Sequence, residues 1–514
     1  MNSRTPTRQS LPLILLFVAV KMTLSPLLVS PLYDLHRDEY LHLDQARHLA
    51  AGYLSVPPLT SWVALAIQAL GSSDAWVRFF PALLGAATIA VAMLLVRELG
   101  GRLFALALTG TALTFSGLLR LNLLFQPNSF DVLAWTALFY LAVGYVRTGR
   151  SPWLYAAAVA AALAFLNKYN IVFLLAALVP FLLGARPSLL RNRHAWLAAA
   201  LFFALIAPNL YWQYINGFPV FHHMQELSDT QLANNSRGQF FLEQVLFFPG
   251  SFYLLPIALT GLWRSAPLRP YRFLAFVFLC VLCLFAALRA KGYYAVGLHP
   301  AFIAIGSVHL EGLLRNRSYG RWLRPALIVL VIAIFLPPIK ALFPVLAPQE
   351  AAQRSASFRS LGLLRWEDGR DHTLPQDFAD MLGWRELARK TVAVYDSLPD
   401  KNTTIILCDN YGEAGAINHY GRRQSVTAVS FNADYARWFP DLSRISTVIR
   451  VKEESDPVSA EERRLFARID TVAIVMDPYA RETGTRVYVM TEPRVDIARL
   501  LRERVDAAAK EWQK

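Results

Sequence analysis

The chain has 514 residues, of which 55% are hydrophobic and only 17% charged. This balance lies outside the range of ordinary soluble domains and indicates a membrane protein. The formal net charge of +14 does not point to a nucleic-acid partner, because the excess arginines lie in short stretches between apolar runs, where membrane topology accounts for them.

Charge divides the chain into two unlike parts. Residues 1–344 contain 26 Lys and Arg and 11 Asp and Glu, a net of +15, whereas residues 345–514 contain 25 and 26, a net of −1. We expect a transmembrane domain over 1–344, with a large first outer loop at 32–77, and a soluble α/β domain over 345–514. The three cysteines are too few and too scattered to predict a disulfide framework or a metal or redox site.

A membrane-spanning helix needs about 20 apolar residues. Eleven apolar segments of the first part approach or reach this length, so the predicted fold is a polytopic α-helical membrane protein with about eleven spans. They lie at 10–31, 78–97, 102–119, 129–147, 152–167, 169–185, 195–214, 244–263, 272–289, 294–314 and 323–344.

Arginine marks every second connection between these segments. It occurs at Arg4, Arg8, Arg97, Arg102, Arg147, Arg150, Arg186, Arg191, Arg193, Arg264, Arg269, Arg272, Arg315, Arg317, Arg321 and Arg324. Because basic residues resist transfer across the bilayer, these connections are expected on the cytoplasmic side. The remaining connections, at 32–77, 120–128, 215–243 and 290–293, are expected on the outer side, together with the C-terminal part.

The first outer loop begins with a charged cluster, LHRDEYLHLD at residues 35–44. Behind Asp38 and Glu39, apolar residues recur at helical spacing as far as Gly52, which predicts an amphipathic helix lying on the membrane surface. The run Val56–Leu59, with its two prolines, ends this helix.

The two acids at the start of this helix have two possible roles. Asp38 is in the position of a helix cap, and the pair would also complement the helix dipole. Alternatively, one carboxylate accepts a proton from a substrate hydroxyl. Consecutive helical residues diverge by about 100°, so Asp38 and Glu39 cannot both point at one reacting atom. The residues alone leave both roles open.

Five stretches between residues 37 and 421 carry a family resemblance. They are RDEYLHLDQARHLAAGYLSVPPL, NSFDVLAWTALFYL, AFLNKYNIVFLL, AKGYYAVGLHPAFIAIG and DNYGEAGAINHYG. In this order they resemble the GT-C membrane glycosyltransferases, in the branch of the protein O-mannosyltransferases and the lipid A aminoarabinose transferase, the RgtA/B/C/D-like family. The likeness covers most of the chain.

The resemblance implies a hexosyl- or pentosyltransferase of the bacterial plasma membrane, with its active site on the outer side. Such an enzyme takes a sugar from a polyprenyl phosphate and gives it to a lipid, glycan or protein acceptor, without a required cofactor. Asp38 would be the general base of an inverting displacement, and Glu39 an orienting or acceptor-side group.

The same resemblance implies cations near the lipid phosphate. Lys168, between two short apolar segments, and Lys291, beside Tyr293, match family positions there. Arg37 and Arg120 are further candidates, although a side chain that marks a helix end is the favoured role for both. Relatives of the aminoarabinose type carry a basic residue just before PPL, where this chain has Val56. One phosphate contact is therefore missing from the pattern.

Further residues are candidates for lining the substrate: Asp131, His222, His223 and Tyr294. The spacing of His222, His223 and Glu226 would allow a divalent cation on one helical turn, but two histidines and one acid are a weak metal signal, and an exposed helix is favoured. For Asn128, at the start of the fourth segment, helix capping is favoured over sugar binding.

The C-terminal part alternates between strand and helix patterns. Strands are expected at 403–410, 446–451, 471–477 and 485–490, and helices at 376–397, 412–420, 459–468 and 493–511. The NYGEAG turn after the first strand is similar to a nucleotide-binding turn, but its spacing is not GxGxxG. A role in substrate shaping or acceptor docking is expected instead.

Two other functions are also compatible with a chain that has many apolar spans. A transporter or flippase of polyprenyl-linked glycans would place ionisable groups at mid-membrane and show internal repeats, whereas here the charges cluster in outer loops. A ligase that uses a diphosphate-linked glycan donor is not distinguished by the sequence.

Overall fold

The computed structural model of the protein describes residues 10–511, with side chains as far as residue 508. Arg4 and Arg8 lie outside the described residues. The chain forms two compact units: unit 1 contains the chain up to Leu28, Arg78–Leu210 and Ser228–Phe343, and unit 2 contains Val29–Val77, Tyr211–Leu227 and Pro344–Lys514. The first outer loop, which the sequence analysis assigned to the transmembrane domain, thus lies in the unit of the C-terminal part.

Helices make up unit 1, and one lies in each of the eleven expected segments. They are α1 (Ser10–Leu27), α4 (Asp74–Glu98), α5 (Leu103–Thr114), α7 (Pro127–Thr148), α8 (Pro152–Asn167), α9 (Ile171–Ala185), α10 (Arg193–Ile215), α13 (Leu254–Arg264), α14 (Phe273–Ala287), α15 (His299–Leu314) and α16 (Gly320–Phe335). The shorter α6 (Leu118–Leu121) and α12 (Arg237–Phe247) lie between them. Among the described residues, six helical segments are long and apolar enough to cross a membrane, namely α1, α4, α7, α10, Arg269–Ala287 and Gly292–Leu314.

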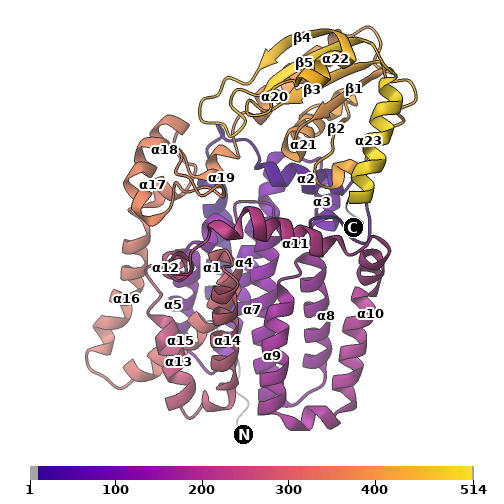
Figure 1. Cartoon of the computed structure of the whole chain (residues 1–514). Coiled ribbons are helices and arrows are strands. Elements are labelled where there is room, and N and C mark those ends of the chain that lie inside the picture. The colour runs from indigo at the N-terminus through magenta and orange to yellow at the C-terminus, as the bar shows by residue number, and fades with distance from the viewer. Residues whose placement is uncertain (1–9, 512–514) are drawn as a thin grey trace. The chain divides into compact units, whose positions relative to one another are not determined.

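Small residues let the helices of unit 1 pack closely. A Cβ atom at Gly306 of α15 would lie 2.2 Å from the carbonyl oxygen of Leu254 in α13, so only glycine allows this backbone contact. The two helices run side by side, as do α7 and α8 (Figure 1). Trp135, Phe139 and Phe302 are fully buried in the common core.

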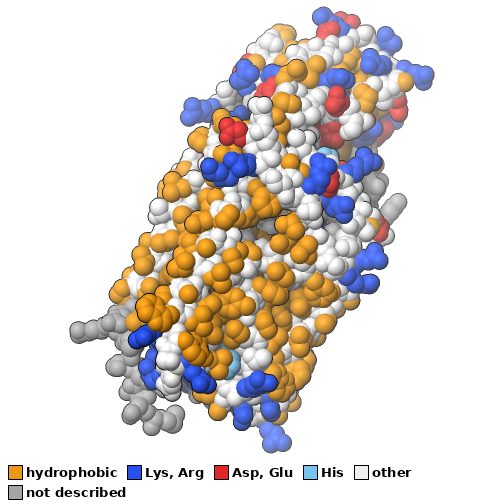
Figure 2. Space-filling view, turned by 90° about the vertical axis from the view of Figure 1, so that its left-hand side faces the viewer, with side chains coloured by type: hydrophobic (Ala, Val, Ile, Leu, Met, Phe, Trp, Pro, Cys, Tyr) orange, Lys and Arg blue, Asp and Glu red, His pale blue; other side chains and the backbone are white. Residues whose placement is uncertain are grey.

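The surface of unit 1 is apolar where a lipid-facing surface is expected. Trp322 and Val329 of α16 are 71% and 62% exposed, and Trp263 of α13 is 49% exposed. Figure 2 shows hydrophobic side chains covering the face of the helical unit, with Lys and Arg gathered at its lower end. This distribution is that of a polytopic membrane protein.

Unit 2 contains a five-stranded sheet in the order β2-β1-β3-β5-β4. Its strands are β1 (Thr404–Cys408), β2 (Ala428–Ser430), β3 (Thr447–Lys452), β4 (Phe466–Ile474) and β5 (Arg486–Pro493). β1 pairs in parallel with both β2 and β3, and β5 runs antiparallel to β3 and β4. The predicted α/β fold of the C-terminal part is confirmed.

Helices of unit 2 lie before, between and after these strands. They are α11 (Pro219–Thr230), which extends into unit 1, α18 (Pro348–Ser355), α19 (Gln376–Ala379), α20 (Trp384–Ser397), α21 (Tyr411–Tyr420), α22 (Ala460–Leu465) and α23 (Ile497–Glu511), whereas the short α17 (Ile339–Leu342) belongs to the end of unit 1. The helix expected over 459–468 is wrong at its C-terminal end, because β4 begins at Phe466 and pairs there with Pro493. The three-residue β2 was not predicted.

The first outer loop contributes α2 (Arg37–Gln45) and α3 (Leu59–Ala69) to unit 2. The prediction of a surface helix is wrong for α2, since every residue from Glu39 to Gln45 is buried. The reason is close packing against α21, where Gly415 leaves room: a Cβ atom there would lie 2.7 Å from Cβ of Tyr40 and 2.7 Å from the Tyr435 hydroxyl. α2 also ends at Gln45, well before Gly52.

Asp44 should be essential to this packing. Its Oδ2 atom accepts hydrogen bonds from Asn418 and from the Tyr435 hydroxyl, both at 2.7 Å, and all three side chains are buried. We expect Asp44→Ala to lower stability by about 1–3 kcal/mol for each buried donor left without a partner. Thermal unfolding of the full-length protein in detergent measures this. Glu503→Ala on the exposed side of α23 is the control, and an equal melting temperature for both variants would contradict the expectation.

Candidate active site

The start of α2 is fixed by a capping box. The residue before the helix, His36, has an extended backbone, and its N–H donates to Glu39 Oε2 at 2.6 Å. Glu39 is fully buried. The capping role considered for Asp38 is therefore wrong, because the residue at the cap position is His36, whose backbone binds Glu39. The Glu39 side chain is thus used to hold the start of the helix, whereas the Asp38 side chain is not part of the cap.

The Asp38 carboxylate is held by a residue far along the chain. The Tyr411 hydroxyl, from the first residue of α21, donates to Asp38 Oδ1 at 2.6 Å. The guanidinium of Arg37 lies over the Tyr411 ring, 4.6 Å from its centroid. The Asp38 side chain remains 34% exposed, which leaves part of it accessible to a substrate.

Charge keeps Asp38 ionised. Burial alone would raise its pKa, but the charges of His36 and Arg37 and the Tyr411 hydrogen bond outweigh burial and hold the pKa of Asp38 below its ordinary value. At neutral pH the group is therefore a carboxylate, the form in which it can accept a proton from a hydroxyl.

His36 lies between two carboxylates. Its Nε2 atom is 3.5 Å from Asp380 Oδ2, and its Nδ1 atom is 3.8 Å from Asp38 Oδ2. Burial lowers the pKa of the ring, but the hydrogen bond to Asp380 and the charge of Asp38 outweigh it and raise the pKa of His36 to about 9. A charged ring cannot accept the Asp38 N–H, which lies 3.2 Å from Nδ1. The ring of His36 therefore either accepts the Asp38 N–H in its neutral form or pairs with Asp38 and Asp380 in its charged form. The two flanking carboxylates favour the charged form.

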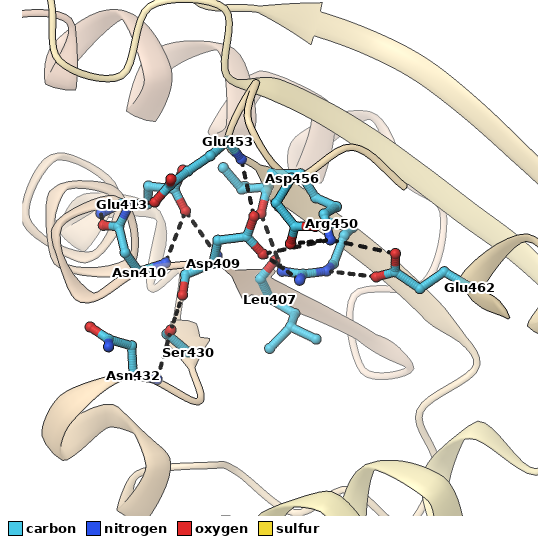
Figure 3. Close-up of polar contacts among 12 residues, drawn as sticks. Leu407, Asp409, Asn410, Glu413, Ser430, Asn432, Arg450, Glu453, Asp456 and Glu462 are labelled. Atoms are coloured by element: carbon cyan, nitrogen blue, oxygen red, sulfur yellow. Dashed lines mark hydrogen bonds and ion pairs between the residues drawn. The ribbon is translucent and has the colours of Figure 1, made fainter. Parts of the chain in front are cut away.

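Tyr411 follows the point where ligands commonly bind in open α/β sheets. β1 lies between β2 and β3 and is parallel to both, so the chain changes direction across the sheet at the carboxyl ends of β1 and β3. Here, however, the site is filled by the protein itself (Figure 3). Glu413 Oε2 accepts the N–H groups of Asp409 and Asn410 at 2.9 and 3.2 Å, in an ordinary capping box.

Arg450 completes this network, which Figure 3 shows in close-up. Its guanidinium donates to Asp409 and to Glu462, while the N–H of Glu453 donates to Asp409 Oδ2 at 3.0 Å. Burial and the charge of Glu482 raise the pKa of Glu413 well above its usual range. The network fixes the turn that carries Tyr411.

Unit 1 holds a separate cluster around Lys168. This residue follows α8, and its Nζ donates to Asn128 Oδ1 at 2.8 Å. Nζ also lies over two aromatic rings, 4.4 Å from the centroid of Tyr294 and 5.0 Å from that of Tyr293. The predicted capping role of Asn128 is wrong, because its side-chain oxygen binds this lysine.

The remaining predicted residues of unit 1 have other partners. Asp131, which is buried, accepts hydrogen bonds from Trp135 Nε1 and Asn170 Nδ2, both at 2.9 Å, and so ties the Lys168 loop to α7. Lys291 Nζ donates to Gln231 at 2.6 Å.

The segment that carries both tyrosines, Gly292–Leu298, is anchored to α12. Glu243 accepts the N–H of Gly292 at 2.9 Å, and a Cβ atom at Gly292 would lie 2.0 Å from that carboxylate. This position therefore requires glycine.

Three further predicted residues lie on two other helices. On α11, His222 is exposed and His223 is half-buried, and no group of three His, Cys, Asp or Glu side chains within residues 10–508 is arranged to hold a metal ion. Arg120 lies on α6. Conversely, the sequence analysis missed Tyr411 and Asp380, since no local pattern reports a partner more than 300 residues away.

His36 gives the stability of unit 2 a specific pH dependence. The folded protein binds the His36 proton more tightly than the unfolded chain, in which the ordinary pKa is 6.5. The stabilisation is therefore complete below about pH 6.5 and is lost as the pH rises through about 9.

We expect His36→Gln to lower the melting temperature most at pH 6 and progressively less towards pH 9. Thermal unfolding across this range measures the difference, with His222→Gln on the exposed face of α11 as the control. A difference that does not change with pH would contradict the assignment.

Comparisons with known proteins agree with the fold. The model of the dolichyl-phosphate-mannose-protein mannosyltransferase family matches residues 55–212. Lipid A galacturonosyltransferase RgtD of Rhizobium johnstonii is 27% identical over 325 residues, which are 60% of this chain and 67% of that protein.

Solved structures show the same fold at low sequence identity. ArnT from Cupriavidus metallidurans in the apo state matches with a TM-score of 0.63 over 95% of this chain and 99% of its own, at 16% identity. The same protein bound to undecaprenyl phosphate gives a TM-score of 0.60 over 93% and 97%, also at 16% identity. The chain thus has the fold of the GT-C membrane glycosyltransferases, and its sequence is similar to the mannosyltransferase family model and to RgtD, the resemblance that its five sequence motifs indicated.

Proposed function

We propose that the protein transfers a sugar from a polyprenyl-phosphate donor to a hydroxyl of a lipid A-type glycolipid on the outer face of the bacterial inner membrane. The observation that carries this proposal is the ionised, partly exposed Asp38 carboxylate held by Tyr411. The names of RgtD and of ArnT bound to undecaprenyl phosphate support the acceptor class and the donor class, respectively.

In the proposed reaction Asp38 takes the proton of the acceptor hydroxyl. The acceptor oxygen then forms a bond to the anomeric carbon of the sugar, while the bond from that carbon to the phosphate oxygen breaks. The bonding electrons leave with the lipid phosphate, and the configuration at the anomeric carbon inverts. A group with a depressed pKa suits this role because it stays deprotonated between reaction cycles, although each proton transfer is less favourable.

The Lys168 cluster is suited to an anionic lipid headgroup. An ammonium that rests on two aromatic faces and one amide oxygen carries a positive charge without a directly bonded carboxylate, since the nearby Asp131 directs its oxygens at Trp135 and Asn170. A phosphate oxygen would therefore gain a charge-assisted hydrogen bond there. We propose Lys168 as the main phosphate partner, with Lys291 and Tyr293 contributing from Gly292–Leu298 and its flank.

Asp38→Asn tests the base. We expect transfer from radiolabelled polyprenyl-phosphate sugars to lipid A to fall about a hundredfold to ten-thousandfold in reconstituted protein, because the amide cannot accept the proton. Asp396→Asn, whose exposed side chain pairs with Lys401, is the control. Undiminished transfer by Asp38→Asn would remove Asp38 as the base. Transfer only from diphosphate-linked donors would replace the proposed donor class.

Lys168→Met tests the phosphate contact. Loss of one charged hydrogen bond, worth about 1.5–3 kcal/mol, should raise the KM for the donor about 10- to 100-fold and change the KM for the acceptor little. Initial rates over a range of donor concentrations measure this. Lys340→Met on the surface of unit 1 is the matched control. A donor KM equal to that of the wild type would exclude Lys168 from phosphate binding.

A further inference from the structure

We propose that Tyr411 of the C-terminal domain is a positioning residue for Asp38, which it orients through the hydrogen bond to Oδ1. This inference rests on the proposed function, because it assigns Asp38 as the base. It extends the catalytic machinery from the first outer loop to a domain that the sequence suggested only for docking or substrate shaping.

The contact has the geometry of a strong hydrogen bond. The distance of 2.6 Å from the Tyr411 hydroxyl to Asp38 Oδ1 is in the range of charge-assisted O–H···O bonds. Burial and the charge of Asp38 raise the pKa of Tyr411 well above its usual range, so the hydroxyl keeps its proton. Tyr411 therefore acts as a donor throughout the pH range in which Asp38 works.

The backbone of Tyr411 is fixed from both sides. Asn410, the cap of α21, accepts the N–H of Glu413 at 3.0 Å, and its Nδ2 donates to Glu453 at 2.8 Å, just beyond β3. Gly412 follows Tyr411, and a Cβ atom there would lie 2.9 Å from the Trp384 ring and 3.2 Å from Cβ of Arg37. These contacts hold the tyrosine hydroxyl against the start of α2.

The hydroxyl and the ring of Tyr411 have separable roles. The ring supports the Arg37 guanidinium, whereas the hydroxyl alone touches Asp38. Tyr411→Phe keeps the ring and removes only the hydrogen bond. If the hydrogen bond from Tyr411 to Asp38 were purely structural, Tyr411→Phe would lower the stability of the protein. It would then reduce the transfer rate by the same factor at every pH.

A positioning role predicts a different result. The groups whose charges or hydrogen bonds act most on Asp38 are His36, Arg37 and His42 around its own helix and Tyr411 on α21. Since the Tyr411 hydrogen bond favours the ionised carboxylate, its removal raises the pKa of Asp38. The acid limb of the rate profile should then move to higher pH.

The experiment compares Tyr411→Phe with the wild type in lipid, using undecaprenyl-phosphate-linked sugars and lipid A. We expect kcat to fall about 10- to 100-fold, the value for a hydrogen bond to a charged group, with the donor KM within about threefold of wild type. The acid limb should move up by about one pH unit. Tyr420→Phe on the same helix, whose hydroxyl lies 3.1 Å from that of Tyr40, is the control and should leave the profile unchanged.

A double variant separates this inference from the proposed function. If Tyr411 acts through Asp38, then adding Tyr411→Phe to Asp38→Asn should cost no further activity. Full activity of Asp38→Asn overturns the proposed function, and the inference with it. Loss of activity in Asp38→Asn together with a wild-type rate and profile in Tyr411→Phe overturns the inference alone. The inference is also overturned if Tyr411→Phe reduces the activity of Asp38→Asn by the same factor as it reduces that of the wild type. Tyr411 would then act on the fold, and the melting temperature should fall in parallel.

Discussion

The docking of α2 on α21 is the constraint on which the candidate active site depends. Two glycines, Gly412 and Gly415, let the helices approach closely, and Asp44 binds two donors from the C-terminal domain. This packing brings the start of α2 against the start of α21, and so places Asp38 beside Tyr411. A carboxylate on an independent surface helix would be mobile and fully hydrated. Here the Asp38 carboxylate has a defined orientation before any substrate arrives, as the proposed role of a base requires.

This arrangement buries several charged side chains, which is unfavourable, and the structure offsets the unfavourable burial by pairing opposite charges. His36 is flanked by Asp38 and Asp380, and Arg481 donates to Asp380 at 3.2 Å. Removing one partner from such a chain leaves another charge uncompensated, which is more costly than losing an exposed ion pair. The same network lowers the pKa of the proposed base, because the charges that stabilise the fold also keep Asp38 ionised. If Asp38 is the base, stability and catalysis are therefore coupled in unit 2.

The sequence predicted the features that local patterns encode. Each of the eleven apolar segments contains a helix, and six helical segments among the described residues are long enough to cross a bilayer. The C-terminal part contains strands at the four places where they were expected. Asp38 and Lys168 became candidates through a family resemblance. In contrast, Glu39 was expected to be an orienting or acceptor-side group, and only the hydrogen bond from the His36 backbone shows that it caps the helix. The contact of Tyr411 with Asp38 could not be predicted from the sequence, because it depends on how two segments 373 residues apart pack together.

The turn after β1 has a consequence for selectivity. In many α/β domains the amides at such a turn attract any phosphate that comes near. In this protein the carboxyl group of Glu413 already satisfies the N–H groups of Asp409 and Asn410 from inside the same helix. Because these two donors are paired within the protein, they offer no hydrogen bond to an anion that approaches from outside.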